Sequence, residues 1–133
     1  MKKPIAVLFL LISLISLNSF SQSKEEIITN SSAEEFNDLI SARTDASVIL
    51  DVRTSKEFES GHIENAVNID YFSNDFENSL SKLDKSKTYF VYCKSGVRSG
   101  KASNMLNKLG FKKIYTLKGG IDNWSAKGFS VVK

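Results

Sequence analysis

The chain has very little cysteine, histidine or proline, and these shortages narrow its possible chemistry. Its 133 residues include one cysteine, Cys93, one histidine, His62, and one proline, Pro4. A single cysteine cannot form an internal disulfide, which excludes a disulfide-stapled fold. With one cysteine and one histidine, a zinc site would have to be completed by carboxylates. We therefore expect neither a metal nor any other cofactor.

The chain also lacks internal repeats, low-complexity tracts and a strong charge imbalance. Hydrophobic residues make up 41%, charged residues 25%, and the net charge is +3, which is ordinary for a soluble globular protein. The absence of repeats excludes a solenoid. No basic stripe interleaved with aromatic residues is present, so a nucleic-acid partner is not expected. The length suits one domain, and we expect a monomer.

Residues 1–21 have the three parts of a secretory signal peptide. Two lysines form a positive head, residues 5–17 are almost wholly apolar, and Ser19 and Ser21 offer small side chains at a cleavage site. The apolar run is shorter than the roughly 20 residues that span a bilayer. We expect cleavage after Ser21, no stable membrane insertion afterwards, and a periplasmic or secreted location. An uncleaved N-terminal anchor is the alternative.

The rest of the chain is predicted to form a polar, mobile lead-in at residues 22–31 and one domain at residues 32–133. Apolar and β-branched runs predict strands at residues 48–50, 66–69, 88–92 and 114–117. Apolar residues at helical spacing predict helices over 33–40, 54–61, 76–83 and 99–109, two of them with capping-box spacing. This alternation predicts an α/β fold, a mostly parallel sheet with helices on both faces.

The only cysteine lies where a predicted strand ends and a predicted helix begins. A loop in that setting can point successive backbone N–H groups inward and bind an anion. The helix dipole, Lys94 and Arg98 would favour the reactive thiolate of Cys93, and Arg98 can bind an oxyanion with its planar donors. We predict Cys93 as the nucleophile, and as the binding loop Lys94, Ser95, Gly96, Val97, Arg98 and Ser99. Two alternatives stay open: Cys93 only packs in the core, and Lys94 only faces solvent.

Several short motifs occur in a fixed order along the chain. They are Asp51-Val52-Arg53, Glu57-Phe58, Gly61-His62-Ile63 with Ala66 and Asn68-Ile69, the six-residue loop from Cys93 to Arg98, and Leu117-x-Gly119-Gly120 with Trp124. Together they resemble the rhodanese family over nearly all of residues 32–133. The resemblance implies a three-layer α/β sandwich and a sulfurtransferase. In such an enzyme the Cys93 thiolate takes the outer sulfur of a donor such as thiosulfate, and the resulting persulfide passes it to cyanide or a thiol.

The other motif residues are predicted to support the site. Arg53 and Glu57 lie four positions apart and are expected to form a structural ion pair. His62 is expected to make structural hydrogen bonds, because a Cys–His pair cannot be inferred from sequence distance. Asp51 is expected to hydrogen-bond the active loop. Trp124 is expected in the core or in the wall of the cleft.

Three other functions remain open at this point. A phosphatase also uses a cysteine and an arginine around an oxyanion, but its loop resembles Cys-x5-Arg, whereas four residues separate Cys93 from Arg98. A persulfide carrier for one partner protein thiol would load sulfur without turning over small acceptors. A redox sensor would use sulfenic acid at Cys93 and would need unusual reactivity towards peroxide.

Overall fold

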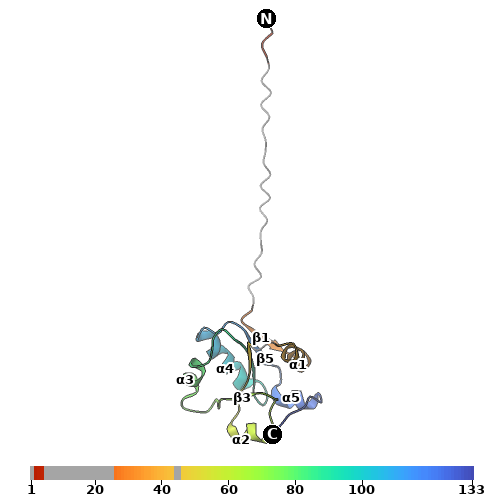
Figure 1. Ribbon diagram of the computed structural model, residues 1–133, viewed down its shortest axis with the longest axis vertical. Coiled ribbons are helices and arrows are strands. Elements are labelled where there is room, and N and C mark those ends of the chain that lie inside the picture. The colour runs from red at the N-terminus through yellow and green to blue at the C-terminus, as the bar shows by residue number, and fades with distance from the viewer. Residues whose placement is uncertain (1, 5–25, 44–45) are drawn as a thin grey trace.

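The computed structural model describes residues 2–4, 26–43 and 46–133, where strands and helices alternate (Figure 1). The elements are β1 (Ile28–Ser31), α1 (Ala33–Ser41), β2 (Ser47–Asp51), α2 (Ser55–Ser60), β3 (Val67–Asn68), α3 (Phe76–Ser81), β4 (Thr88–Tyr92), α4 (Val97–Lys108), β5 (Ile114–Leu117) and α5 (Gly120–Ala126). Apart from residues 2–4, the predicted signal peptide lies outside the described residues. Within the described ranges, no helix has the length and apolar character to cross a bilayer.

The five strands form one sheet in the order β1-β5-β4-β2-β3, and every neighbouring pair is parallel. β4 is the central strand, and its last residue, Tyr92, lies opposite Asp51 at the end of β2. Because the strands are parallel, their carboxyl ends meet at one edge of the sheet, where ligands bind in open α/β folds. The predicted parallel sheet is confirmed.

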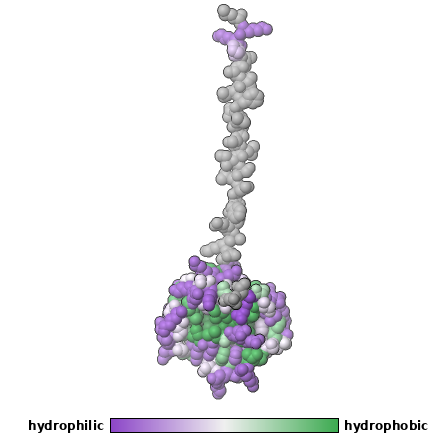
Figure 2. Space-filling view, in the orientation of Figure 1, coloured by the Kyte–Doolittle hydropathy of each residue, from purple (hydrophilic) through white to green (hydrophobic). Residues whose placement is uncertain are grey.

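Alternating side chains of the strands build two cores, one on each face of the sheet. Leu50, Tyr89, Val91 and Ile114 pack with residues of α3 and α4 on one face. Ile49, Phe90, Tyr92 and Leu117 pack with residues of α1 and α5 on the other. Figure 1 shows these helix pairs on opposite sides of the sheet, which confirms the three layers. Polar side chains surround a smaller hydrophobic area on the face of the domain drawn in Figure 2.

Both predicted capping boxes are present. The Ser32 hydroxyl accepts a hydrogen bond from the backbone N–H of Glu35 at 3.1 Å, and the Glu35 carboxylate accepts one from Ser32 at 3.3 Å. Thr54 and Glu57 make the same reciprocal pair at 3.2 and 3.4 Å at the start of α2. Each box satisfies two N–H groups that a helix start leaves without a partner. Local sequence therefore fixes where α1 and α2 begin.

The prediction of a mobile lead-in over residues 22–31 is wrong for its last four residues. Ile28–Ser31 form β1, which pairs with β5 along its whole length. The side chain of Asn30 accepts a hydrogen bond from Thr116 at 3.0 Å, and Ser31 is buried. The strand has the sequence Ile-Thr-Asn-Ser, with one apolar residue and no apolar run, so its polar composition concealed it. Residues 22–25 lie outside the described part of the chain.

Replacing Leu106 with alanine should destabilise the domain by about 2–5 kcal/mol, because it removes a fully buried side chain and leaves a cavity between α4 and the sheet. Chemical denaturation followed by circular dichroism measures the change. Lys101→Ala, on the exposed side of the same helix, should change stability by less than about 0.5 kcal/mol. Equal losses for the two variants would contradict the described packing of α4.

Candidate active site

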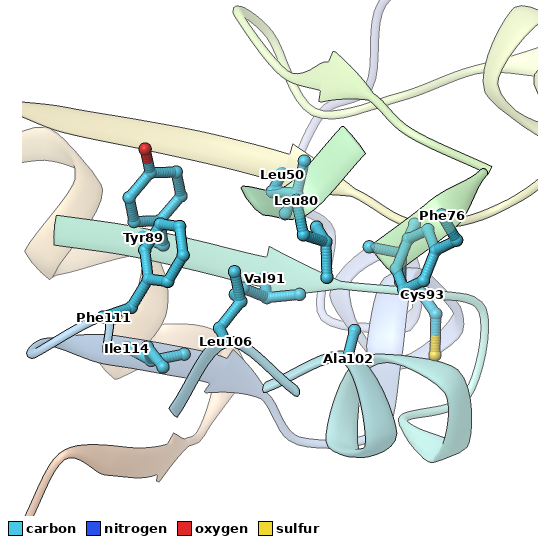
Figure 3. Close-up of a cluster of buried hydrophobic side chains, with 11 residues drawn as sticks. Leu50, Phe76, Leu80, Tyr89, Val91, Cys93, Ala102, Leu106, Phe111 and Ile114 are labelled. Carbon is cyan, nitrogen blue, oxygen red and sulfur yellow. The ribbon is translucent and has the colours of Figure 1, made fainter. Parts of the chain in front are cut away.

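Cys93 follows β4 directly and lies at the carboxyl edge of the sheet. Its side chain is 1% exposed and belongs to the core between the sheet, α3 and α4. Figure 3 shows it just beyond the end of β4, with the sulfur pointing towards the loop and the turns of α4. The central strand therefore carries the only thiol of the chain to the edge where the sequence predicted a site.

The loop from Cys93 to Ser99 curls around the sulfur. The backbone N–H of Gly96 donates a hydrogen bond to Sγ at 3.1 Å, and the hydroxyl oxygen of Ser99 lies 3.4 Å from it. In this contact the neutral thiol donates to the Ser99 hydroxyl, which in turn donates to the carbonyl of Gly96 at 3.2 Å. Gly96 has a φ of 111°, a conformation that favours glycine. The predicted cradle of N–H groups at the start of a helix is thus formed around the sulfur.

Hydrogen bonds control the ionisation of Cys93. Burial alone would raise the pKa of the thiol, because the charged form loses hydration. The Ser99 hydroxyl and the backbone N–H groups of Ser99, Gly96 and Ser95 outweigh this effect, and the pKa of Cys93 is lowered from its ordinary value. A buried thiolate stabilised by several donors is a nucleophile held ready in a fixed geometry.

Helix α5 holds the other side of the loop. The N–H of Ile121 donates to the carbonyl of Cys93 at 2.9 Å, and the N–H of Asp122 donates to that of Lys94 at 3.1 Å. Gly120 makes this approach possible: its φ is 62°, and a Cβ there would lie 2.6 Å from the Cys93 carbonyl oxygen and also collide with the Lys94 backbone. Sequence reasoning did not foresee this contact; two adjacent glycines at the start of a helix were the available signal.

The structure corrects the predicted partners of two charged motif residues. Glu57 does not pair with Arg53. It binds Arg98 across the mouth of the loop through two hydrogen bonds, of 2.8 and 3.0 Å. Arg53 turns into the protein and binds Asp51 at 2.7 Å. Spacing along one helix suggested the wrong pair because Arg53 precedes α2 and its guanidinium is bound by Asp51 and by the carbonyl of Gly61.

The Asp51–Arg53 pair is structural. The side chains are 0% and 5% exposed, and Arg53 also donates to the carbonyl of Gly61 at 2.7 Å. The expectation that the Asp51 carboxylate would bond the active loop is wrong, because its oxygens accept hydrogen bonds from Arg53. The nearby Tyr92 hydroxyl accepts from the N–H of Ile63 at 3.0 Å. These contacts tie the segment after α2 to the central strand.

His62 and Trp124 have the structural roles that the sequence suggested. Nδ1 of His62 lies 3.0 Å from the carbonyl of Phe58, and the two rings stack with centroids 3.8 Å apart. Trp124 is 4% exposed in the core beneath α1, and its indole N–H donates to the carbonyl of Ser130 at 3.0 Å. Neither side chain makes a described contact with the sulfur.

Two features at the outside of the loop complete the site. Lys94 forms an exposed ion pair with Asp122 at 2.7 Å, so its charge faces solvent. The guanidinium of Arg98 lies over the ring of Phe72, 5.5 Å from its centroid, and Phe72 is 66% exposed. Sequence reasoning missed Phe72, an aromatic residue in a polar stretch. Within the described residues, no group of three histidine, cysteine or acidic side chains is placed to hold a metal ion.

Comparison with known proteins identifies the family. Residues 32–127 match the family described as the rhodanese-like domain. The chain belongs to this family. The rhodanese-related protein of Thermoplasma volcanium has a similar solved structure, with a TM-score of 0.68 and 32% identity, and the match covers 78% of this chain and 97% of that one. The family and the fold implied by the sequence resemblance are thereby confirmed.

Curated relatives of this rhodanese-like domain differ in their named activities. A thiosulfate sulfurtransferase of Coxiella burnetii is 37% identical over 79 residues, which cover 59% of this chain and 72% of the relative. A tRNA uridine(34) hydroxylase of Pelagibacter ubique is 35% identical over 111 residues, 83% of this chain and 35% of the relative. An uncharacterized protein of Bacillus subtilis is 39% identical over 79 residues, 59% of this chain and 61% of the relative. This chain therefore spans less than two thirds of the last two proteins.

Gly120→Ala should destabilise the domain by more than about 1 kcal/mol, because a left-handed φ is costly with a Cβ and the methyl group collides with the loop backbone. It should also slow reactions of Cys93. Gly100→Ala is the matched control: Gly100 lies inside α4, where an added methyl group would meet no neighbouring part of the fold within 4 Å, and the change should stabilise by about 0.5–1 kcal/mol. Thermal or chemical denaturation compares them, and an unharmed Gly120→Ala variant would contradict the close contact.

The thiolate of Cys93 should form at a lower pH than that of a free cysteine, whose pKa is about 8.5, because hydrogen bonds lower its pKa. Ultraviolet absorbance of the thiolate against pH, with Cys93→Ser as the blank, measures the midpoint. Ser99→Ala removes one of the stabilising donors and should shift the midpoint upward. A wild-type midpoint at or above that of a free cysteine would contradict the described cradle.

Proposed function

We propose that this rhodanese-like domain is a sulfurtransferase that carries sulfane sulfur as a persulfide on Cys93. One observation carries the proposal: the buried sulfur of Cys93 lies inside a loop whose Gly96 N–H donates to it at 3.1 Å. A site of this kind offers a nucleophile and an anion-binding cradle at the same point. Thiosulfate is the simplest donor to test, and cyanide or a small thiol the simplest acceptor.

In the first step, the Cys93 thiolate attacks the outer sulfur of the donor. With thiosulfate, a new S–S bond forms to Cys93 as the S–S bond of the donor breaks, and sulfite leaves with the electron pair. The thiolate that starts the reaction is stabilised by Ser99 and by the loop N–H groups. The terminal sulfur of the product is an anion as well, and the same N–H groups are positioned to bind it.

In the second step, an acceptor attacks the terminal sulfur of the persulfide. Cyanide gives thiocyanate and a thiol acceptor gives a new persulfide, and both return the Cys93 thiolate. The two half-reactions share one site and exchange one sulfur atom, so the kinetics should be ping-pong. The Cys93–Lys94 carbonyls bound by α5 keep the loop fixed between the half-reactions.

The named relatives support this proposal to different degrees. The similarity to a thiosulfate sulfurtransferase of Coxiella burnetii favours sulfur transfer. The similarity to tRNA uridine(34) hydroxylases covers a quarter to a third of those longer proteins, so it favours a shared domain rather than a shared reaction. An alternative function with the same chemistry is a sulfur carrier, which transfers the persulfide sulfur to the thiol of one partner protein.

We further propose that the domain acts outside the cytoplasm, in the periplasm or in the medium, after removal of residues 1–21. The positive head, short apolar run and small residues of that segment support export. An exported protein meets oxidising conditions, where a free exposed thiol is readily oxidised. The 1% exposure of Cys93 would protect it there.

Incubation with thiosulfate should add the mass of one sulfur atom to the protein, and cyanide should remove it, because the cradle around Cys93 favours both the thiolate and the persulfide. Intact-mass spectrometry of reduced protein measures both changes. Cys93→Ser should never gain the mass. If neither thiosulfate nor an alkyl persulfide loads the reduced wild-type protein, the sulfurtransferase proposal fails. Loading without turnover of small acceptors would instead identify a carrier.

A further inference from the structure

Both cations beside the Cys93 loop already have carboxylate partners. Arg98 is bound by Glu57 and Lys94 by Asp122, with closest N–O distances of 2.8 and 2.7 Å. The mouth of the site therefore presents two neutralised pairs instead of two free positive charges. Hydrogen bonds from the loop, rather than a cationic pocket, provide the attraction for anions.

The Glu57–Arg98 pair is well held. It has the two-pronged geometry of strong arginine–carboxylate pairs, and its side chains are only 29% and 17% exposed. The Glu57 carboxylate also accepts hydrogen bonds from Thr54 in the capping box. The hydrogen bonds from Arg98 lower the pKa of Glu57 to about 2. Near neutral pH, Glu57 is thus charged and occupies the donors of Arg98.

Two exposed apolar side chains accompany Arg98 at the surface. Phe72 is 66% exposed and its ring lies under the Arg98 guanidinium. Val97, the loop residue before Arg98, is 64% exposed. Exposed apolar side chains beside a nucleophile favour a substrate whose carrier group is itself apolar or uncharged. A small dianion such as thiosulfate gains nothing from them.

Building on the sulfurtransferase function, we propose that Glu57, assisted by Asp122, determines donor specificity by charge. Glu57 occupies the hydrogen-bond donors of Arg98. The site therefore prefers alkyl persulfides, which have low charge and an apolar carrier group, to the dianion thiosulfate. Binding of thiosulfate through Arg98 requires the bidentate Glu57–Arg98 ion pair to break, whereas binding of an alkyl persulfide leaves this pair intact. Glu57 is a specificity residue that acts through Arg98 and does not touch the reacting sulfur.

The reaction with this donor balances without any further reagent. The Cys93 thiolate attacks the outer sulfur of an alkyl persulfide, R–S–SH. The new S–S bond to Cys93 forms as the S–S bond of the donor breaks, and the electron pair leaves with RS⁻. The proton stays on the transferred sulfur, and its later loss to solvent gives the same Cys93 persulfide anion that thiosulfate gives. No net oxidation or reduction takes place.

The test is how Glu57→Gln changes the choice between two donors. Thiosulfate and the persulfide of N-acetylcysteamine, whose carrier is uncharged, are each mixed with reduced protein, and quenched intact-mass time courses give two loading rates. Because the donors differ in intrinsic reactivity, the ratio of rates is compared between variants. The glutamine side chain can still make the capping-box hydrogen bond, but it lacks the negative charge that holds Arg98. The ratio of persulfide to thiosulfate loading should fall by about fivefold, equivalent to about 1 kcal/mol.

Glu59→Gln is the matched control, because it removes the same charge from an exposed position of α2; it should leave the ratio unchanged. Thiosulfate loading should also depend more steeply on ionic strength in Glu57→Gln than in wild type, since a freed cation attracts a dianion and salt screens that attraction. A purely structural role of Glu57 would not change this slope.

The outcomes separate this proposal from the proposed function. An unchanged ratio and an unchanged salt slope in folded Glu57→Gln overturn donor selection by Glu57, while loading of Cys93 still supports sulfur transfer. Absence of loading by both donors in wild type overturns both. Where Glu57→Gln does not fold, Asp122→Asn decides: it releases exposed Lys94 and should lower the ratio by about twofold. No change in that variant counts against the proposal.

Discussion

The contact between α5 and the peptide that links Cys93 to Lys94 is the constraint on which the site depends. Two N–H groups of α5 bind the carbonyls of these two residues, and the missing side chain of Gly120 lets the helix come close enough. With both carbonyls held on one side, the N–H groups that follow are free to turn inward to the sulfur on the other. The sheet fixes the position of Cys93, and the contact with α5 fixes the direction in which the loop after Cys93 turns.

This arrangement stabilises a buried anion with dipoles. A thiolate that is 1% exposed has lost nearly all its hydration, and the loss is offset by donors within hydrogen-bond reach. The full positive charges of Lys94 and Arg98 lie at the outside of the loop, where each forms an ion pair with a carboxylate. In the proposed sulfur transfer, fixed N–H dipoles would not need to reorganise as the negative charge moves from the thiolate to the leaving group and then to the persulfide. A cradle of this kind suits a sulfur that is repeatedly an anion at nearly the same point.

Sequence patterns were sufficient for eight of the ten elements in the described residues, for the parallel sheet and for the loop that surrounds Cys93, because these depend on local periodicity, capping boxes and strand-to-helix order; β1 and the helix α5 were not predicted. They failed where partners are set by the fold. The spacing of Arg53 and Glu57 suggested one pair, whereas tertiary structure makes two, with Asp51 and with Arg98. The strand β1 was missed because an edge strand of polar composition has no periodic signal. Phe72 could not be placed because only the folded chain brings it to Arg98.

The two ion pairs that the sequence did not predict, Asp51–Arg53 and Glu57–Arg98, also link the stability of the domain to the proposed donor specificity. The buried Asp51–Arg53 pair holds the carbonyl of Gly61 after α2, and the capping box fixes the start of that helix. Both ends of α2 are therefore restrained, and Glu57 in its first turn meets Arg98 of α4, 41 positions along the chain. A buried pair lost by removing one partner leaves an uncompensated charge and costs several kcal/mol. If Glu57 sets donor preference as proposed, replacing this partly exposed residue should cost less stability than replacing the buried Asp51 or Arg53.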